Sequence, residues 1–437
     1  MSVISAPSAQ QQRDYFATHE LAPTDDNIIK SLTEDKFGRN EYLKHFLCFL
    51  DHIHYSCSIA IDGQWGCGKS FFVKQAKALL EYYNPQIKTA DIAIVDAAQL
   101  ELTHSFLPIY YDAWANDNAN DPFLSLIHTI ATDNNVLSED RLKGQVPFLK
   151  KAAAFVDMIC DTNIKEFYEQ KDADDLLAEI KKQKDFERTI HEFLDSCKPE
   201  VADRIVIFID ELDRCRPSFA VQLLERVKHY FSYEDVTFVL SINSAELEHT
   251  IRAFYGQDFD AHRYLDRFFD YRVELPEIDH VKFMRSIQFD ESVCSLILLN
   301  AVIQCYHLSI REAEKLSRAL NVAGGIIENR QNLGLLTSYN RIFYHLFLPI
   351  ILGLKMVSTS KFRQFINGKN PQLLNEIRTY SEETKLYFQN FQTTGGYLLK
   401  DSNTTESLYR EFFSQDSDML ARYMDIVNML SPYASYH

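Results

Sequence analysis

The sequence predicts an α/β fold in which helices flank a parallel sheet, with a helical insertion and an α-helical lid and C-terminal domain. Two observations lead to this prediction. Apolar, β-branched runs end in glycines or acids, and segments with helical periodicity separate them. Strands that alternate with helices form parallel sheets, whose carboxyl ends bring their loops to one edge. A chain of 437 residues is long enough for two or three such domains.

The first strand, expected at residues 58–62, runs directly into a phosphate-binding loop. Residues 63–70 read Gly-Gln-Trp-Gly-Cys-Gly-Lys-Ser and complete the pattern GxxxxGKS. Glycines without a Cβ let the backbone aim successive N–H groups at an anion, and the following helix adds its positive dipole end. We expect the nucleotide to be bound by Gly63, Gln64, Trp65, Gly66, Cys67, Gly68, Lys69, Ser70 and Phe71.

Two of these side chains have specific roles in the predicted P-loop NTPase sheet. Lys69 neutralises the β- and γ-phosphates, and the Ser70 hydroxyl ligates Mg²⁺. The helix that carries them is expected at residues 70–82, because Pro85 disfavours its continuation. A strand at 107–111 follows, and then a charged helical insertion at about 122–200, which is longer than a simple crossover needs.

The second informative stretch is the apolar strand 204–210, which ends in two acids. Asp210 is expected to hold the water shell of the Mg²⁺ ion, and Glu211 to orient and polarise the attacking water. An apolar strand that ends in acids is common by itself. The assignment therefore depends on the phosphate-binding loop upstream.

Two further residues are candidates for the same site. Asn243 follows the buried strand 236–242, where its amide could hold the attacking water or simply form a turn. Arg311 lies in the first turn of a helix that opens at Ser309. An arginine there opposes the helix dipole, which indicates either an external anion or ordinary solvation at the surface.

Composition limits the partners. The formal charge of −17, from 45 basic and 62 acidic residues, argues against a surface built to hold nucleic acid. Eight scattered cysteines without a CxxC pair indicate reduced thiols and a cytoplasmic location. The apolar stretch 342–354 is too short to span a bilayer and is expected to be a buried helix, so no membrane partner is predicted.

Together these motifs resemble the KAP P-loop NTPases, a bacterial and animal group in the AAA+/STAND branch, across roughly residues 27–370. The marks are the Gly-Arg pair at 38–39, Trp65 within WGxGKS, Tyr-Asp-Ala-Trp at 111–114, Asp-Glu-Leu-Asp-Arg-Cys at 210–215 with Pro217, and Tyr-Leu at 264–265. The resemblance implies that Arg267 is an arginine finger acting on a neighbouring subunit's nucleotide, and that Arg311 is the sensor-2 arginine.

The resemblance also implies a domain division and a biological setting. We expect a flexible N-terminal arm at 1–26, the NTPase core at 27–276, a helical lid at 277–370 and a C-terminal helical region at 371–437. The absence of transmembrane helices from the insertion implies a soluble bacterial member. The arginine finger that the resemblance implies also implies a homo-oligomer. Relatives in phage-exclusion and antiviral operons imply a role in anti-phage defence, with a protein partner or effector from the same operon.

The sequence leaves three functions open. The first is an ATPase that uses Mg²⁺ and ATP as a conformational switch or motor. The second is a scaffold that assembles on ATP with little turnover. The third, a self-contained nuclease or protease, is weakest, because no HExxH, GxSxG or finger-type Cys/His spacing is present. The sequence has no base-reading motif that would distinguish ATP from GTP, so ATP is implied by the family resemblance alone.

Overall fold

The computed structural model describes residues 23–87, 100–119, 121–133, 185, 188–198, 201–230, 234–287, 289, 294–332, 338–391, 401–414 and 417–430. The chain divides into two compact units. The first comprises Met1–Asp35 and Arg39–Pro276, and the second comprises Lys36–Gly38 and Glu277–His437. Each unit is described by itself.

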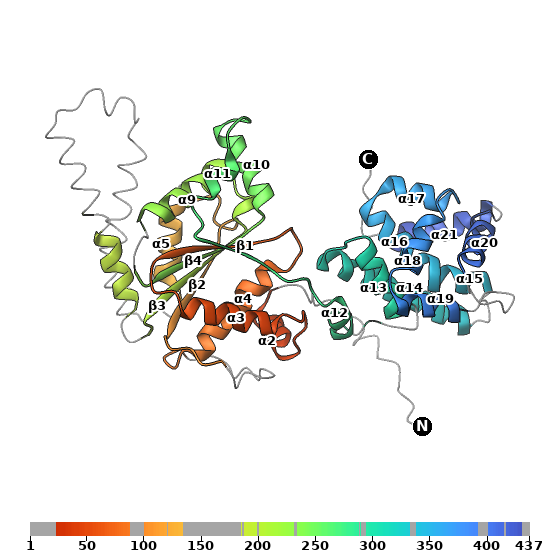
Figure 1. Cartoon of the computed structure of the whole chain (residues 1–437), viewed down its shortest axis with the longest axis horizontal. Helices are drawn as coiled ribbons and strands as arrows, with labels where there is room; N and C mark the ends of the chain where they lie inside the picture. The colour runs from red at the N-terminus through yellow and green to blue at the C-terminus, as the bar shows by residue number, and fades with distance from the viewer. Residues whose placement is uncertain are drawn as a thin grey trace. The chain divides into compact units, whose positions relative to one another are not determined.

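The first unit is built on a five-stranded parallel sheet. Its strands are β1 (Cys57–Asp62), β2 (Phe106–Asp112), β3 (Arg204–Asp210), β4 (Val236–Ile242) and β5 (Tyr271–Glu274). They lie in the order β2-β3-β4-β1-β5, and every neighbouring pair is parallel (Figure 1). The predicted α/β class with a parallel sheet is confirmed.

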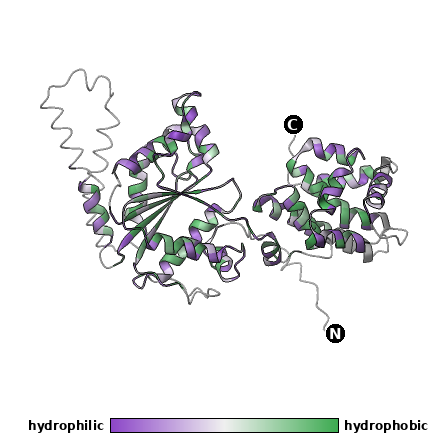
Figure 2. Ribbon diagram, viewed as in Figure 1, coloured by the Kyte–Doolittle hydropathy of each residue, from purple (hydrophilic) through white to green (hydrophobic). Residues whose placement is uncertain are grey.

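Helices cover both faces of this sheet (Figure 1). One layer contains α2 (Asp25–Thr33), α3 (Asn40–Asp51) and α4 (Lys69–Tyr83); the other contains α5 (Pro122–Thr132), α9 (Pro217–Tyr230), α10 (Ser244–Tyr255) and α11 (Ala261–Leu265). The central strands β3 and β4 are buried along their length, whereas the covering helices carry hydrophilic as well as hydrophobic residues (Figure 2). Strands buried on both faces read as continuous apolar runs, which is why the sequence shows them so clearly.

Local signals explain where these helices begin. Asp121 caps α5 by accepting hydrogen bonds from the backbone N–H groups of Phe123 and Leu124, at 2.8 and 3.1 Å, and Pro122 occupies the first turn. Thr24 caps α2, so this helix begins two residues before the expected start of the core at residue 27. Residues 1–22 of the expected arm lie outside the described residues.

The expected helical insertion at 122–200 is described only at its two ends. Its beginning is α5, and residues 188–197 near its end are also helical. Residues 134–184 lie outside the described part of the chain. The insertion leaves the sheet after β2 and leads back to β3, and these two strands are neighbours in the sheet.

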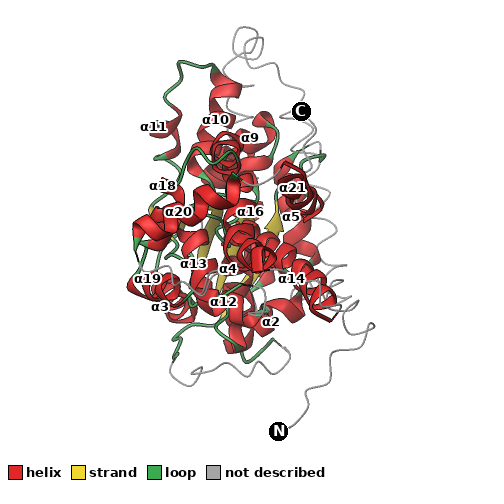
Figure 3. Cartoon of the chain, turned by 90° about the vertical axis from the view of Figure 1, so that its right-hand side faces the viewer, coloured by secondary structure: helices red, strands yellow, loops and turns green. Residues whose placement is uncertain are grey.

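The described residues of the second unit form helices and connecting segments without any strand (Figure 3). The helices are α12 (His280–Ser286), α13 (Leu296–Cys305), α14 (Ile310–Asn332), α15 (Ser338–Ile342), the π-helix η3 (Phe343–Phe347), α16 (Leu348–Val357), α17 (Thr359–Ile366), α18 (Gln372–Arg378), α19 (Glu382–Asn390), α20 (Ser402–Phe413) and α21 (Ser417–Leu430).

The core of the second unit is aromatic and aliphatic. The apolar stretch expected at 342–354 is part of a longer one, Asn340–Val357, which is long and apolar enough to cross a membrane, so the expectation that it is too short was wrong. However, 67% of it is buried within the fold, as in the core helix of a globular domain. Phe347 packs against Phe365, Tyr409 and Phe412 with ring centroids 4.6–6.4 Å apart. Gly353 is needed here, because a Cβ at this position would lie 2.6 Å from Val302 of α13.

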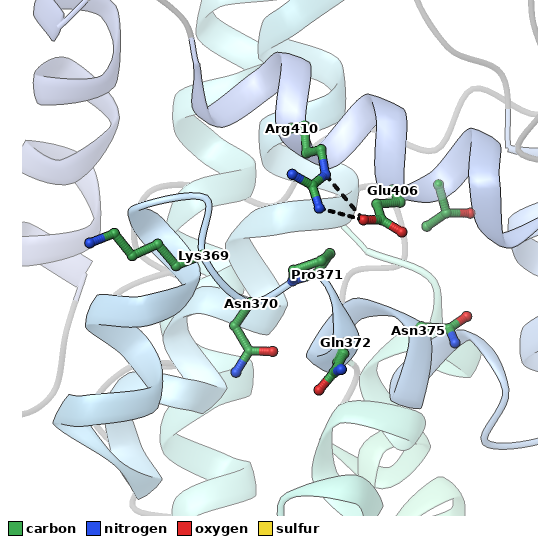
Figure 4. A pocket seen from close by; sticks show the side chains of 8 residues that line it. Lys369, Asn370, Pro371, Gln372, Asn375, Glu406 and Arg410 are labelled. Atoms are coloured by element: carbon green, nitrogen blue, oxygen red, sulfur yellow. Dashed lines mark hydrogen bonds and ion pairs between the residues drawn. The ribbon is translucent and has the colours of Figure 1, made fainter.

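The second unit also contains a polar pocket of about 470 Å³ (Figure 4). Arg410 donates to Glu406 at 2.7 Å through Nη2, so two of the charges at the pocket partly neutralise each other. The lining residues are Lys369, Asn370, Pro371, Gln372, Asn375, Thr405, Glu406 and Arg410.

At the amino edge of the sheet in the first unit, a buried polar cluster joins α3 to β2 and β3. The Asp51 carboxylate accepts hydrogen bonds from the backbone N–H and hydroxyl of Thr103, at 2.8 and 2.7 Å, and from His104. Arg204 donates to the carbonyl oxygens of Asp51 and Ile53. Burial raises the pKa of Asp51, but these hydrogen bonds outweigh it and hold the pKa below its usual value.

We expect Asp51→Asn to lower the free energy of unfolding by about 2 kcal/mol at neutral pH, because an amide cannot accept this set of donors. The folded-state pKa of Asp51 is depressed, so its stabilisation is present above the unfolded-state pKa of about 3.9 and is lost as pH falls through the folded value. Denaturant unfolding at pH 7 and below pH 4 measures this. The exposed Asp258→Asn is the control, and a penalty that stays constant with pH contradicts the assignment.

Candidate nucleotide-binding site

The loop between β1 and α4 has a backbone that only glycines adopt easily. Gly66 and Gly68 have φ angles of 82° and 91°, in the left-handed region. Gly63 is constrained differently, since a Cβ there would lie 2.8 Å from the Cys67 sulfur. Its backbone N–H donates to the Ile242 carbonyl of β4 at 3.2 Å. The loop is therefore closely folded and anchored to the sheet.

Lys69 is the first residue of α4 and is buried within this loop. Its Nζ donates to the carbonyl oxygens of Gly63, at 2.5 Å, and Gln64, at 3.1 Å. An ammonium group has three donors, so one remains for a ligand. No side chain caps the N-terminus of α4, and its first backbone N–H groups are available to an anion. Ser70 lies in this first turn, and Phe71 is buried beneath it.

Arg39 fixes the other side of the loop. Its buried guanidinium donates through Nη1 to the Cys67 carbonyl at 2.8 Å, and through Nε and Nη2 to the Pro276 carbonyl. Burial lowers the pKa of Arg39 to about 10, so the group stays charged at neutral pH. Arg39 thus ties the loop to the last residue of the first unit. The sequence marked Arg39 only as part of a family motif, and nothing local indicated this bridging role.

Asp210 is the last residue of β3 and is buried. Its two oxygens accept hydrogen bonds from the Tyr110 hydroxyl, at 2.9 Å, and from the backbone N–H of Glu211, at 3.0 Å. Burial and the charge on Asp210 raise the pKa of Tyr110 well above its usual value, so the phenol remains a donor. The position directly opposite Asp210 on β2 is Asp112, which places a further acid at this edge.

Glu211 has an unusual backbone and a paired side chain. Its φ of 60° lies in the left-handed region, which costs energy for a residue other than glycine. Its Oε2 accepts from Arg214 Nε at 2.7 Å. Burial raises the pKa of Glu211, the charge on Asp210 raises it further, and the charge on Arg214 opposes both. This carboxylate lies at the same sheet edge as Asp210.

The phosphate-binding loop and the acidic segment are in direct contact. Trp65 Nε1 donates to Asp213 Oδ2 at 2.5 Å, across a separation of 148 residues in sequence. Burial raises the pKa of Asp213. The hydrogen bond from Trp65 and the charge of Lys69 oppose this rise. Lys69 is therefore close enough to act electrostatically on the segment that follows β3.

The remaining candidates are placed as follows. Asn243 precedes α10, and its side chain does not cap that helix. The next residue, Ser244, donates its N–H to Asp62 at the end of β1, so this strand end lies beside the loop.

Arg267 is exposed just after α11. Arg311 is exposed in the first turn of α14, in the second unit, where Ser309 and Glu312 form a capping box.

These features define the class of protein. A parallel sheet in the order β2-β3-β4-β1-β5, with a GxxxxGKS loop after β1 and an Asp-Glu pair after β3, is a P-loop NTPase domain. The chain belongs to the KAP family: residues 39–329 match the KAP family P-loop domain. No match was found among curated proteins.

Two solved structures are similar to this chain. One is the Aeropyrum pernix Orc1 protein in complex with DNA, with 16% identity, a TM-score of 0.37, and coverage of 94% of this chain and 87% of that chain. The other is C. elegans PCH-2, with 12% identity, a TM-score of 0.24, and coverage of 90% and 73%. Likenesses this distant carry no argument about function.

We expect Arg39→Ala to weaken ATP binding about tenfold, because the loss of a charge-assisted bridge of about 1.5–3 kcal/mol frees the Cys67 carbonyl and loosens the loop. Fluorescent-nucleotide titration measures this. Arg39→Lys keeps the charge but cannot reach both carbonyls, and should recover part of the affinity. Arg263→Ala, an exposed arginine of α11, is the control. An unchanged affinity in folded Arg39→Ala contradicts the role.

Proposed function

We propose that the protein is a Mg²⁺-dependent ATPase that uses its bound nucleotide as a switch or motor controlling a partner protein. The observation that carries this proposal is the contact between Trp65 of the phosphate-binding loop and Asp213 beside the acidic pair. This contact supports an arrangement in which a cradle for phosphates lies next to carboxylates that suit a hard cation. These are the two halves that phosphoryl transfer requires.

The residues fit ATP and Mg²⁺. The positive φ angles of Gly66 and Gly68, the uncapped start of α4 and the buried Lys69 ammonium provide donors for the phosphates. Ser70 and Asp210 would hold the metal ion, which supplies charge neutralisation at the β- and γ-phosphates. Each Asp210 oxygen has a second lone pair beyond its present hydrogen bond, so both can still accept from metal-bound water.

Glu211 would accept a hydrogen bond from the attacking water and orient it, and the Asn243 amide would hold the same water from the end of β4. Proximity supports this assignment. Asp62 pairs with Ile242, and Ile209 pairs with Leu240, so the ends of β1, β4 and β3 are level. Side chains that directly follow these strands therefore share one edge.

We further propose that neighbouring copies complete the site in a homo-oligomer. Arg267 would contact the nucleotide of the adjacent subunit, and Arg311 would serve as the sensor-2 arginine. Both are exposed. The family resemblance supports a protein that acts in the cytoplasm. It also supports a role in anti-phage defence, with a partner effector encoded in the same operon.

We expect Lys69→Ala and Glu211→Gln to fail in different ways. The first should weaken ATP binding by about tenfold or more, because it removes the cation from the loop. The second should retain ATP but lower the turnover number about 100-fold, because it removes the base. Phosphate release and nucleotide titration separate the two effects. Lys77→Ala, on the same helix but paired with Glu81, is the control. Equal turnover in Glu211→Gln rules out its role.

The arginine finger makes a separate prediction. Arg267→Ala alone should lose about 10³-fold in turnover. Mixing it with Glu211→Gln should restore part of the activity, since an intact Arg267 from one subunit can serve an intact Glu211 in another. Phosphate release from the mixture measures this, with Arg263→Ala as a control that should stay active. A mixture no more active than the average of its components excludes action between subunits.

The scaffold function remains the second candidate, and the Glu211–Arg214 ion pair favours it, because a paired carboxylate is a weaker base. In that case ATP would drive assembly without phosphate release. Size-exclusion chromatography with ATP, ADP and no nucleotide, run beside the release assay, distinguishes the two functions.

A further inference from the structure

The chain contains only two tryptophans, and the side chain of Arg214 lies close to both. Its guanidinium carbon is 5.8 Å from the ring centre of Trp65 and 5.8 Å from that of Trp114. Both distances are within the range of a cation–π contact. The indoles are large side chains left 45% and 55% exposed, which is unusual for tryptophan. Exposed aromatic rings at the edge of a site, instead of in the core, point to a role in the site.

This cluster connects three segments at the sheet edge. Trp65 belongs to the phosphate-binding loop, Trp114 follows β2, and Arg214 closes the short 3₁₀ turn Leu212–Arg214 after β3. Trp65 also donates to Asp213 within that turn. A movement of the loop at Trp65 would therefore be transmitted to the position of Arg214.

Arg214 is paired with the carboxylate that the proposed hydrolysis needs. Its Nε donates to Glu211 Oε2 at 2.7 Å, so the charge of that oxygen is partly neutralised. The carboxylate keeps lone pairs for water, but while it is paired with a guanidinium it is a weaker base. To become a stronger base, Glu211 must separate from Arg214. Its backbone is held at a φ of 60° and its N–H is bonded to Asp210, so the side chains have to move.

We propose that Arg214 is a positioning residue that holds Glu211 inactive until nucleotide binding moves Trp65. This inference rests on the proposed ATPase function. Lys69 provides the link: its ammonium donates to the carbonyls of Gly63 and Gln64, the residues directly before Trp65. When Lys69 exchanges these carbonyls for phosphate oxygens, the loop beside Trp65 is released, and with it the contact that keeps Arg214 on Glu211.

The test compares Arg214→Gln, Arg214→Lys and wild type. At ATP concentrations well below saturation, Arg214→Gln should turn over about tenfold faster than wild type, because nucleotide binding no longer has to separate Arg214 from Glu211. At saturating ATP the difference should disappear, and the melting temperature should be unchanged. Arg214→Lys retains a cation and should lie between them. Arg216→Gln is the matched control, because Arg216 lies two residues after Arg214 and pairs with Asp117 instead of Glu211. An Arg214→Gln turnover at low ATP that is equal to or below that of wild type overturns the proposal, and so does a difference that persists at saturating ATP.

Intrinsic fluorescence gives a second readout, because both tryptophans lie in this cluster. ATP should change the emission of wild type, and the change should be reduced in Arg214→Gln. Phosphate release at low ATP that is no faster in Arg214→Gln than in wild type overturns this inference alone. If both bind ATP without releasing phosphate, the ATPase proposal fails as well.

Discussion

The pairing of β4 with β1 on one side and β3 on the other is the constraint on which the site depends. It aligns the strand ends, so that the loop after Asp62 and the acids after Ile209 leave the sheet at one level. Neighbouring strands lie about 4.8 Å apart, which separates β1 from β3 by roughly 10 Å. A slip of one residue would turn Asp210 to the other face of the sheet. Because β3 and β4 are buried along their length, such a slip would misplace packed side chains on both faces of the sheet.

The same edge concentrates negative charge. Asp112 and Asp210 face each other across β2 and β3, and Glu211 and Asp213 follow, while burial raises the pKa of the last two. Lys69 and Arg214 are the cations whose charges oppose these shifts. A divalent cation would relieve this repulsion, so the acids and the phosphate-binding loop form one electrostatic unit. Arg214 is also the ion-pair partner of Glu211.

Much of the fold could be predicted from the sequence, because buried parallel strands read as apolar runs and end in recognisable residues. The strands ending at Asp62, Asp210 and Ile242 were all located, as was the GxxxxGKS loop. The contacts that shape the site could not be predicted. Arg39, Tyr110 and Trp114 act through partners far away in sequence, and only the folded chain brings these together. The roles of Asn243, Arg267 and Arg311, and the domain boundary at 370, stay predictions.

The central claim is that one nucleotide and its metal ion are shared by the phosphate-binding loop and Asp210. A crystal structure with a non-hydrolysable ATP analogue and Mg²⁺ tests it most directly. The account predicts phosphate density against the backbone N–H groups of residues 66–70, with Lys69 turned from its own loop carbonyls to the phosphates. It also predicts a metal between Ser70 and the water shell of Asp210. A nucleotide bound elsewhere, or a metal that Asp210 does not approach, would contradict it.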